Sequence, residues 1–256
     1  MSNTLQVTIS AARQAGAIVR QGYGESVHIT HKGAIDLVTE TDRRSEALIV
    51  GALRDAFPGH AINAEESGRA AGDDYEWLVD PLDGTTNFAH KFPVFSVSIA
   101  LTFQRRLILG VVYDPLRDEL FSAEAGQGAR LNDAPIHVSD TAALDQALLS
   151  TGFPYDVRAN PHNNLAEFTR FVRLAQGVRR TGSAALDCSW LAAGRLDGFW
   201  ELRLNPWDVG AGALIAREAG GRVTTYDGDE DFLGKDTILV SNGVLHNAMM
   251  QVLKGL

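Results

Sequence analysis

The sequence contains a single cysteine, Cys188, and lacks any long uninterrupted hydrophobic run. One cysteine cannot form an intrachain disulfide, and Cys188 lies in the apolar helical stretch AALDCSWLAAG, so we interpret it as a packing residue rather than a nucleophile. No apolar run approaches the roughly 20 residues of a transmembrane helix. The first 20 residues show no basic region followed by an apolar block, so we expect a soluble, cytoplasmic protein without a membrane partner.

The sequence also lacks a basic excess, since 23 Lys and Arg stand against 32 Asp and Glu, a net charge of −9. This balance argues against general nucleic-acid binding, which normally needs clustered Lys and Arg, although a local basic patch is compatible with it. The 256 residues are 45% hydrophobic, which is enough for one large domain or two joined halves with a substantial core.

The spacing of apolar residues predicts two helices near the start of the chain. The first follows an N-cap at Thr4 and stops near Gly22 and Gly24. The second runs from about Asp42 to Phe57, where Pro58–Gly59 ends it. The segment HKGAIDLVTETD between them is typical of a loop and hairpin rather than of a third helix.

The rest of the chain divides near residue 140. Before it, the β-rich segments FSVSIALTF, LILGVVYD, ELFSAE and ARLN predict an antiparallel meander. After it, strands at ALLSTG, DGFWEL, GRVTTY and TILVSN accompany helices at about 163–176, 184–193 and 207–219. We predict an α+β half over 1–140 and an α/β half over 141–256, packed as one unit with a shared cleft because no linker separates them.

The stretch WLVDPLDGTTNF, from Trp77 to Phe88, begins as an apolar strand and then turns acidic. Asp80 and Asp83 end this strand close together, where two bare carboxylates should repel and resist ionisation. The following Thr85–Asn87 predicts the first turn of a helix, whose free backbone N–H groups suit an anion such as phosphate. The segment DPLDG alone is equally compatible with an Asx turn that leads into an ordinary N-cap.

Two other acidic positions follow or begin apolar segments. Glu65 and Glu66 end AINAEES, and Asp208 begins the small-residue helix of NPWDVGAGALIAREAGG. Asp208 alone is typical of a helix cap, but three acidic groups at the ends of apolar elements indicate a shared site. Hard oxygen ligands in this number suit Mg²⁺. Glu66 would point away from the site if the chain is extended there, which leaves it a supporting role.

The segments AEES, WLVDPLDGTTNF and NPWDVGAGALIAREAGG together resemble the inositol monophosphatase family, with matching order and spacing over nearly the whole chain. The segment RRTGSAALDCSWLAAGRLDGFWELRLNPWD is similar to the bacterial branch, which includes an enzyme that doubles as a transcription antitermination factor. The resemblance implies the layered αβαβα fold of the magnesium-dependent, lithium-sensitive phosphatases, and a homodimer.

The resemblance also implies a metal site with two or three Mg²⁺ ions. Glu65, Asp80 and the backbone carbonyl of Leu82 would bind the first ion, and Asp80, Asp83 and Asp208 the second. A third, weaker ion would lie near Glu65.

Further roles follow from the same resemblance. Thr85, with Glu65, would orient the attacking water, so these two residues and Asp80 are the expected catalytic residues. The phosphate would contact Gly84, Thr85 and Thr86, and the rest of the substrate would contact Asp208 and Glu201, the latter through its hydroxyls. Lys32 and Asp42 match a mobile active-site loop. The sequence departs from the family at Ala64, where many relatives carry glycine, which matters only if the backbone there needs a positive φ.

Several other polar residues receive no site role. The histidines near the motifs lack a metal-ligand partner at helical or hairpin spacing, and an arginine pair is compatible with a partner, phosphate or interface contact; these residues are His28, His31, His90, Arg179 and Arg180.

We therefore predict a Mg²⁺-dependent phosphomonoesterase that acts on inositol monophosphate or a similar small polyol phosphate. Hydrolysis of phosphate monoesters needs up to ~10²¹-fold acceleration, and metal ions can supply it by activating water and neutralising the leaving oxygen, without a nucleophilic side chain. One alternative is a related phosphatase for another small ester, such as fructose bisphosphate, a nucleotide phosphate or histidinol phosphate. Another is a regulatory partner of the transcription machinery with incidental phosphatase activity.

Overall fold

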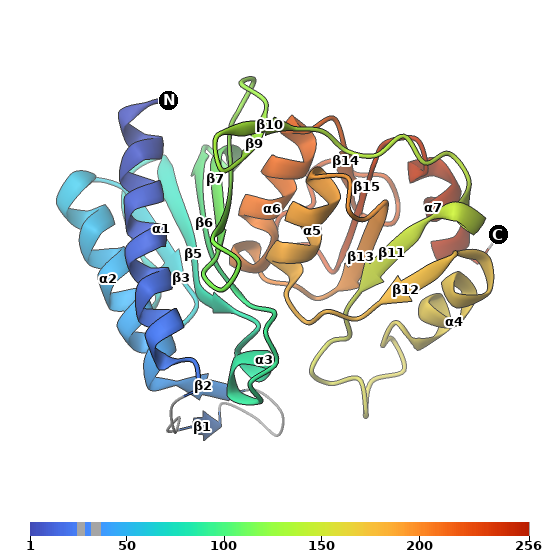
Figure 1. Cartoon of the computed structure of the whole chain (residues 1–256), viewed down its shortest axis with the longest axis horizontal. Helices are drawn as coiled ribbons and strands as arrows, with labels where there is room; N and C mark the ends of the chain where they lie inside the picture. The colour runs from blue at the N-terminus through green and yellow to red at the C-terminus, as the bar shows by residue number, and fades with distance from the viewer. Residues whose placement is uncertain (25–28, 32–36, 256) are drawn as a thin grey trace.

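The computed structural model describes residues 1–24, 29–31 and 37–255. Its elements stack in layers in the order helix, sheet, helix, sheet, helix (Figure 1). The first layer holds α1 (Asn3–Gly22) and α2 (Glu40–Ala56), and the last holds α4 (Leu165–Leu174) and α7 (His246–Leu253). Between them, α5 (Ala184–Ala192) and α6 (Pro206–Glu218) separate the two sheets. The predicted layered αβαβα fold is confirmed.

The larger sheet has eight strands in the order β10-β9-β8-β7-β6-β5-β3-β4. In chain order these strands are β3 (Ala61–Ala64), β4 (Gly68–Ala70), β5 (Tyr75–Asp83), β6 (Ser96–Phe103), β7 (Arg106–Asp114), β8 (Glu119–Glu124), β9 (Ala129–Leu131) and β10 (Ala134–Ile136). From β5 to β10 every neighbouring pair is antiparallel, as the predicted meander requires. Only β3 and β5 pair in parallel.

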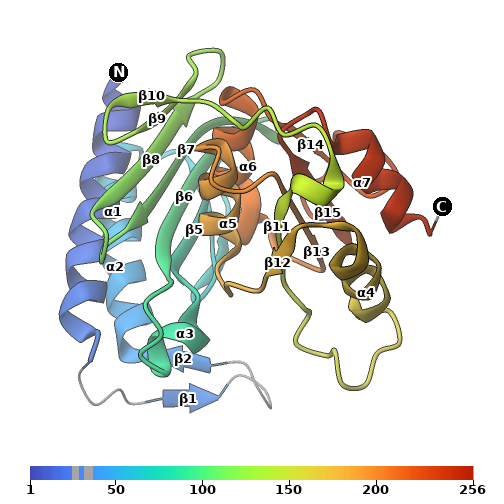
Figure 2. The same ribbon diagram turned by 45° about the vertical axis from the view of Figure 1, so that its right-hand side comes forward.

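The smaller sheet has five strands in the order β12-β11-β13-β15-β14. These are β11 (Leu148–Thr151), β12 (Gly177–Arg179), β13 (Gly198–Leu202), β14 (Arg222–Thr224) and β15 (Thr237–Ser241). The short elements outside both sheets are β1 (Ile29–His31), β2 (Leu37–Thr39), α3 (Thr85–Ala89) and the 3₁₀ turn η1 (Leu144–Gln146). The antiparallel pair β1–β2 agrees with the hairpin expected before α2. α3 lies beside β2 at one end of the molecule (Figures 1 and 2).

Side chains of the larger sheet alternate between its two faces and so contribute to two of the three hydrophobic cores. In β5, Trp77 and Val79 face α1 and α2, while Leu78 faces the α5–α6 layer. This follows from the two-residue period of a strand, which sends successive side chains to opposite faces. Both faces are covered, so β5 reads as a continuous apolar run. The third core lies between the smaller sheet and the outer helices α4 and α7.

The helices of the middle layer are buried on nearly every side because each has a sheet on two sides. All residues from Val209 to Ala216 are buried, as expected for a helix that is apolar all round. The two helices also approach each other closely. A Cβ atom on Gly212 would lie 2.6 Å from the Cβ of Cys188, so the small residues of this layer are a packing requirement. Cys188 is fully buried there, in agreement with its predicted packing role.

Two details correct the sequence-based prediction. The N-cap of α1 is Ser2, whose Oγ accepts a hydrogen bond of 3.1 Å from the backbone N–H of Leu5, and Thr4 lies inside the helix. The final helix, α7, was not anticipated after the last predicted strand. No helix in the described ranges is long and apolar enough to cross a membrane.

The two sheets come from separate parts of the chain. The strands of the larger sheet lie within residues 61–136 and those of the smaller sheet within 148–241. α6 nevertheless packs against β6, β7 and β8, so the second part of the chain covers one face of the larger sheet. We keep the division near residue 140 as a proposal.

Candidate active site

A cleft lies where the larger sheet, α6 and the smaller sheet meet. It is lined by nine of the residues that the sequence singled out, namely Glu65, Asp80, Leu82, Asp83, Gly84, Thr85, Thr86, Glu201 and Asp208. Glu65 directly follows β3, and Asp208 lies in the first turn of α6. Glu201 comes from β13. Segments from distant parts of the chain thus deliver the predicted carboxylates to one place.

The end of β5 is bulged, and the bulge explains how two aspartates three residues apart reach the same cleft. Asp80 pairs with Ser98 and Asp83 with Ser96, so three steps on β5 stand against two on β6. Pro81, between them, has no N–H for the ladder. In a regular strand, residues three apart point to opposite faces, and the extra residue of a bulge restores the same face.

Hydrogen bonds hold one oxygen of each aspartate. Oδ1 of Asp80 accepts from the N–H of Leu82 at 3.0 Å, which is the Asx-type turn considered for DPLDG. Oδ2 of Asp208 accepts from the N–H of Asn205 at 2.7 Å and completes the capping box of α6. A local structural role and a place in the cleft therefore coexist at Asp80 and Asp208.

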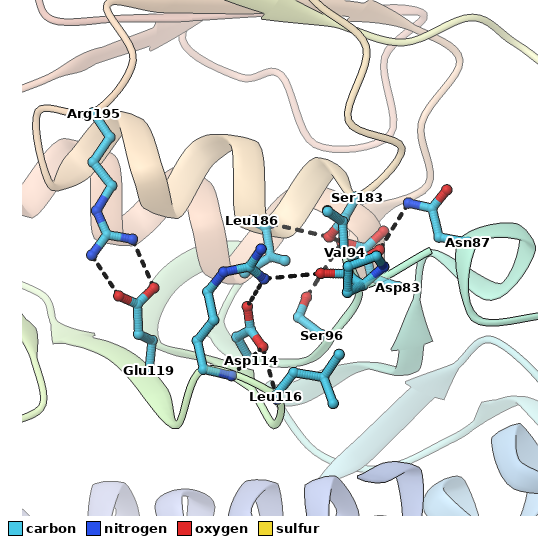
Figure 3. Close-up of polar contacts among 12 residues, drawn as sticks. Asp83, Asn87, Val94, Ser96, Asp114, Leu116, Glu119, Ser183, Leu186 and Arg195 are labelled. Atoms are coloured by element: carbon cyan, nitrogen blue, oxygen red, sulfur yellow. Dashed lines mark hydrogen bonds and ion pairs between the residues drawn. The ribbon is translucent and has the colours of Figure 1, made fainter. Parts of the chain in front are cut away.

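Asp83 is held by a more distant segment (Figure 3). Its Oδ2 accepts from Ser183 Oγ at 2.5 Å, from the N–H of Ala185 at 2.9 Å and from Ser96 Oγ at 3.5 Å. Among the described residues, none donates a hydrogen bond to the second oxygen of Asp83, Asp80 or Asp208. Each carboxylate therefore has one fixed oxygen and one without a donor among the described residues.

Several acidic side chains gather in this cleft, which Arg180 and Arg203 also line. Within the described part of the chain, no Lys, Arg or His forms an ion pair with Asp80, Asp83 or Asp208. Burial raises the pKa of Asp80 well above its usual range, with Glu65, Asp83 and Asp208 adding to the effect. Burial likewise raises the pKa of Asp208, and it raises that of Asp83 to about 6. The cleft is therefore short of positive charge, as expected for a cation site.

The donor set fits Mg²⁺ in its chemistry. All candidate ligands are hard oxygens, and three of them are carboxylates with an oxygen left over from protein hydrogen bonding. Across residues 1–24, 29–31 and 37–255, no group of three or more His, Cys, Asp or Glu side chains is arranged so that it holds an ion as it stands. Small movements of the side chains are therefore part of the metal hypothesis.

Glycine is required directly after Asp83. Gly84 has φ +99°, and a Cβ atom there would lie 3.0 Å from the carbonyl oxygen of Val94 and 3.2 Å from that of Gly182. The positive φ and the close approach of two chain segments both exclude a side chain. The glycine lets the chain leave β5 and begin α3 at Thr85, and Gly84, Thr85 and Thr86 all line the cleft.

Asp42 does not lie in a loop, contrary to expectation. It is the third residue of α2, fully buried, and it forms a capping box with Thr39. Its Oδ1 lies 3.0 Å from Thr85 Oγ1, which is also 3.0 Å from the carbonyl oxygen of Leu82. Asp42 thus reaches the cleft through Thr85 rather than lining it. Lys32, the other predicted loop residue, lies outside the described residues, as does His28.

Sequence reasoning missed Asp187, which lines the cleft from within α5. Its Oδ2 accepts a hydrogen bond of 2.8 Å from Thr181 Oγ1, whereas Oδ1 is buried without a partner among the described residues. Burial raises its pKa well above the usual range. A charged residue inside the otherwise apolar pattern AALDCSW was the available signal.

Two other polar residues of the cleft wall are Glu201 and Arg180. Glu201 is buried, and its carboxylate lies against Gly152, where a Cβ atom would come within 2.1 Å of Oε1. Burial raises the pKa of Glu201, with Asp187 adding to the effect and Arg180 opposing it. Arg180, left unassigned by the sequence, lines the same cleft. Ala64 lies in β3 and has no positive φ, so the departure from glycine causes no strain there.

Comparisons with known proteins agree with this geometry. The sequence profile of the inositol monophosphatase family matches residues 1–255. An inositol-1-monophosphatase of Synechocystis sp. is 49% identical over 252 residues, which cover 97% of this chain and 88% of that protein. The Nus factor SuhB of Pseudomonas aeruginosa is 43% identical over 262 aligned positions, which cover 99% and 97%. The solved structure of inositol monophosphatase from Anabaena superimposes with a TM-score of 0.90 at 45% identity and covers 99% of this chain and 96% of that one.

Proposed function

The chain belongs to the inositol monophosphatase family, and from this premise we propose that it is a Mg²⁺-dependent phosphomonoesterase that hydrolyses inositol monophosphate or a similar polyol phosphate. The observation that carries the proposal is the group of buried aspartates in one cleft, none of which forms an ion pair with a described Lys, Arg or His. Asp80, Asp83 and Asp208 are costly for the folded protein unless a cation or protons compensate them.

The metal ligands are assigned residue by residue. Glu65, Asp80 and the carbonyl of Leu82 would hold one Mg²⁺, and Asp80, Asp83 and Asp208 would hold a second, with a weaker third ion near Glu65. Mg²⁺ bound there would supply an activated water and neutralise charge on the leaving oxygen. The protein contributes the fixed orientation of each carboxylate, set by the Leu82, Ser183 and Asn205 contacts.

The remaining residues bind and orient. Thr85 Oγ1 lies between Asp42 Oδ1 and the Leu82 carbonyl, and together with Glu65, which lines the same cleft, it would position a water. The backbone N–H groups at Gly84, Thr85 and Thr86 would bind the phosphate at the positive end of the α3 backbone.

Substrate choice rests with the far wall of the cleft. Glu201 and Asp208 are the groups for the polyol, because carboxyl oxygens accept hydrogen bonds from substrate hydroxyls. Glu201 contributes through positioning rather than chemistry, since it lies on β13 and is not among the assigned metal ligands. A related small phosphate ester is compatible with the same wall.

The decisive experiment is a panel of phosphate esters assayed with Mg²⁺ and after chelation. The expected result is turnover of inositol monophosphate only with Mg²⁺, inhibited by lithium, and slower turnover of a nucleotide phosphate or a featureless aryl phosphate. Equal rates with and without chelator would reject the metal assignment. Rapid turnover of another ester with none of inositol monophosphate would move the protein to the related-phosphatase alternative.

A second function is favoured by one relative's name. The Nus factor SuhB is 43% identical to this chain, so we keep a contact with the transcription machinery as an alternative role. A soluble cytoplasmic homodimer is part of the same proposal. Sedimentation of the purified chain and binding assays with purified transcription components test both, with the hydrolysis-deficient Asp83→Asn variant separating binding from catalysis.

A further inference from the structure

The segment 181–185 lies against the segment 83–87, although about 100 residues separate them in the chain. Nδ2 of Asn87 donates a 2.8 Å hydrogen bond to the carbonyl of Thr181. Gly84 approaches the carbonyl of Gly182 so closely that a Cβ atom would lie 3.2 Å away. Ser183 follows and reaches Asp83. Three consecutive contacts therefore align the start of α5 with the end of β5; Figure 3 shows the one between Ser183 and Asp83.

Ser183 is built into this contact in two ways. Its Oγ donates to Asp83 Oδ2 at 2.5 Å and also accepts from the N–H of Leu186 at 3.4 Å, as the N-cap of α5. The side chain is 1% exposed, so water does not compete for the contact. Because its proton goes to Asp83 and its lone pair faces the helix, both hydrogen-bonding functions of this hydroxyl are engaged.

These donors bind only one of the two carboxylate oxygens of Asp83. Ser183 Oγ and the N–H of Ala185 both bind Oδ2, while Oδ1 accepts no hydrogen bond from the described residues. A carboxylate whose one oxygen is held by two donors cannot rotate freely about its Cβ–Cγ bond. Groups that hold metal ligands in this way commonly change metal affinity by about 10–100-fold when they are removed.

We propose that Ser183 is a positioning residue that keeps Oδ1 of Asp83 directed into the cleft and thereby sets the affinity for the second Mg²⁺. This inference rests on the proposed function, because it assigns a metal to Asp83. It gives α5 a role beyond packing. The C-terminal part of the chain contributes Asp208 as a ligand and Ser183 as the group that orients a ligand from the N-terminal part.

The test measures Mg²⁺ binding directly, by the rise in melting temperature and by titration calorimetry of the full chain without substrate. Ser183→Gly removes the hydroxyl donor, and glycine is a tolerated N-cap, so α5 keeps its start. Its Mg²⁺ dissociation constant should rise about tenfold or more. Ser183→Thr restores a hydroxyl and should stay within about threefold of the wild-type constant.

Ser189→Ala is the matched control, since Ser189 is a fully buried serine of the same helix whose Oγ donates to the carbonyl of Ala185 and does not contact Asp83. It should leave the Mg²⁺ constant unchanged. If Ser183→Gly does not fold, Ser183→Cys serves, because a thiol keeps the shape but donates weakly and should also weaken Mg²⁺ binding.

The outcomes separate the two hypotheses. Wild-type Mg²⁺ affinity in Ser183→Gly, or in Ser183→Cys if that variant is used, overturns the positioning role and leaves the proposed function intact. Equal weakening by Ser183→Gly and Ser189→Ala shows a general packing effect and also overturns it. Absence of Mg²⁺ binding and of Mg²⁺-dependent hydrolysis in the wild-type protein overturns the proposed function itself.

Discussion

Asp83 and Asp114 occupy equivalent positions in the larger sheet and have opposite surroundings. Each is the last residue of a strand, β5 for Asp83 and β7 for Asp114, and each is buried, with 9% and 1% of its surface exposed. Figure 3 shows both carboxylates in one view. Asp114 forms an ion pair of 2.7 Å with Arg117, whereas the described residues that bind Asp83 are neutral donors.

The difference separates a carboxylate whose charge is compensated locally from one that we propose as a metal ligand. Asp114 carries its cation three residues further along the chain, and its Oδ1 accepts from the N–H groups of Leu116 and Arg117 at 2.9 and 3.0 Å. Its charge is therefore compensated within one turn. Asp83 ends a similar apolar strand, yet no described Lys, Arg or His forms an ion pair with it. Burial without an ion-pair partner, in a cleft shared with other carboxylates, is what distinguishes Asp83 as a candidate metal ligand.

The largest expected effect is on hydrolytic activity, which should distinguish Asp83→Asn from Asp114→Asn. Asp83→Asn keeps the shape and removes one proposed metal ligand, so hydrolysis of inositol monophosphate should fall at least about 10³-fold, since a catalytic metal contributes several kcal/mol. Asp114→Asn should change kcat by less than about threefold, because Asp114 does not line the cleft. Steady-state kinetics at saturating Mg²⁺ measure both. Substantial Mg²⁺-dependent turnover by Asp83→Asn would make this aspartate a structural turn after all.

The next effect concerns the stability of the metal-free protein. Here Asp114→Asn should be more damaging than Asp83→Asn. Asp114→Asn loses the 2.7 Å charged contact with Arg117 and should lower the free energy of unfolding by about 2 kcal/mol. Asp83→Asn should leave it equal to that of the wild type or raise it, because one of several crowded charges is gone. Urea unfolding in the presence of a chelator provides the measurement. A clear loss of stability in Asp83→Asn would contradict the idea of uncompensated charge.

A smaller effect is the pH dependence of the stability difference between the metal-free wild type and Asp83→Asn. The pKa of Asp83 in the folded state, about 6, lies above its usual 3.8, so the folded protein gains stability from protonation below pH 6 and loses it as the pH rises through 6. Between pH 7 and pH 5 the metal-free wild type should therefore gain about 1 kcal/mol relative to Asp83→Asn.

The variant is also the control for other titrating groups. Burial lowers the pKa of His246 to about 4, which destabilises the folded protein as the pH falls below 6.5 towards 4. This loss occurs equally in both proteins and cancels in the comparison. A difference between them that does not change with pH would show that Asp83 titrates in its ordinary range.

The smallest effect extends the comparison to the surface. Glu119 begins β8 and receives two hydrogen bonds, 2.7 and 2.6 Å, from Arg195, which lowers its pKa. The Arg195 side chain is 41% exposed, so solvent weakens the pair. Arg195→Met keeps most of the stem and should cost about 0.5 kcal/mol, without effect on Mg²⁺-dependent activity. A loss of stability as large as that of Asp114→Asn would mean that solvent exposure does not determine how much each ion pair contributes to the free energy of unfolding.

Much of the architecture was predictable because it depends on short-range rules. The apolar run before Asp80, the glycine after Asp83 and the small-residue helix after Asp208 each follow from local periodicity, turn chemistry and capping. The sequence also indicated nine of the cleft-lining residues, the acidic ones at the ends of apolar segments from their pattern and the others, Glu201 among them, from the family resemblance. Local rules could not decide whether Ser2 or Thr4 is the N-cap of α1, because both side chains are good helix caps.

Only the tertiary structure decided which polar groups meet across the layers. Asp42 contacts Thr85 over 43 positions of chain and Ser183 contacts Asp83 over 100, and neither pair has a local pattern to announce it. The same holds for Asp187. In the sequence it is only a charged residue in an apolar helix, and the tertiary structure shows that it lines the cleft. The physical reason is that periodicity determines which face of an element is buried, while the packing of the layers determines what that face touches.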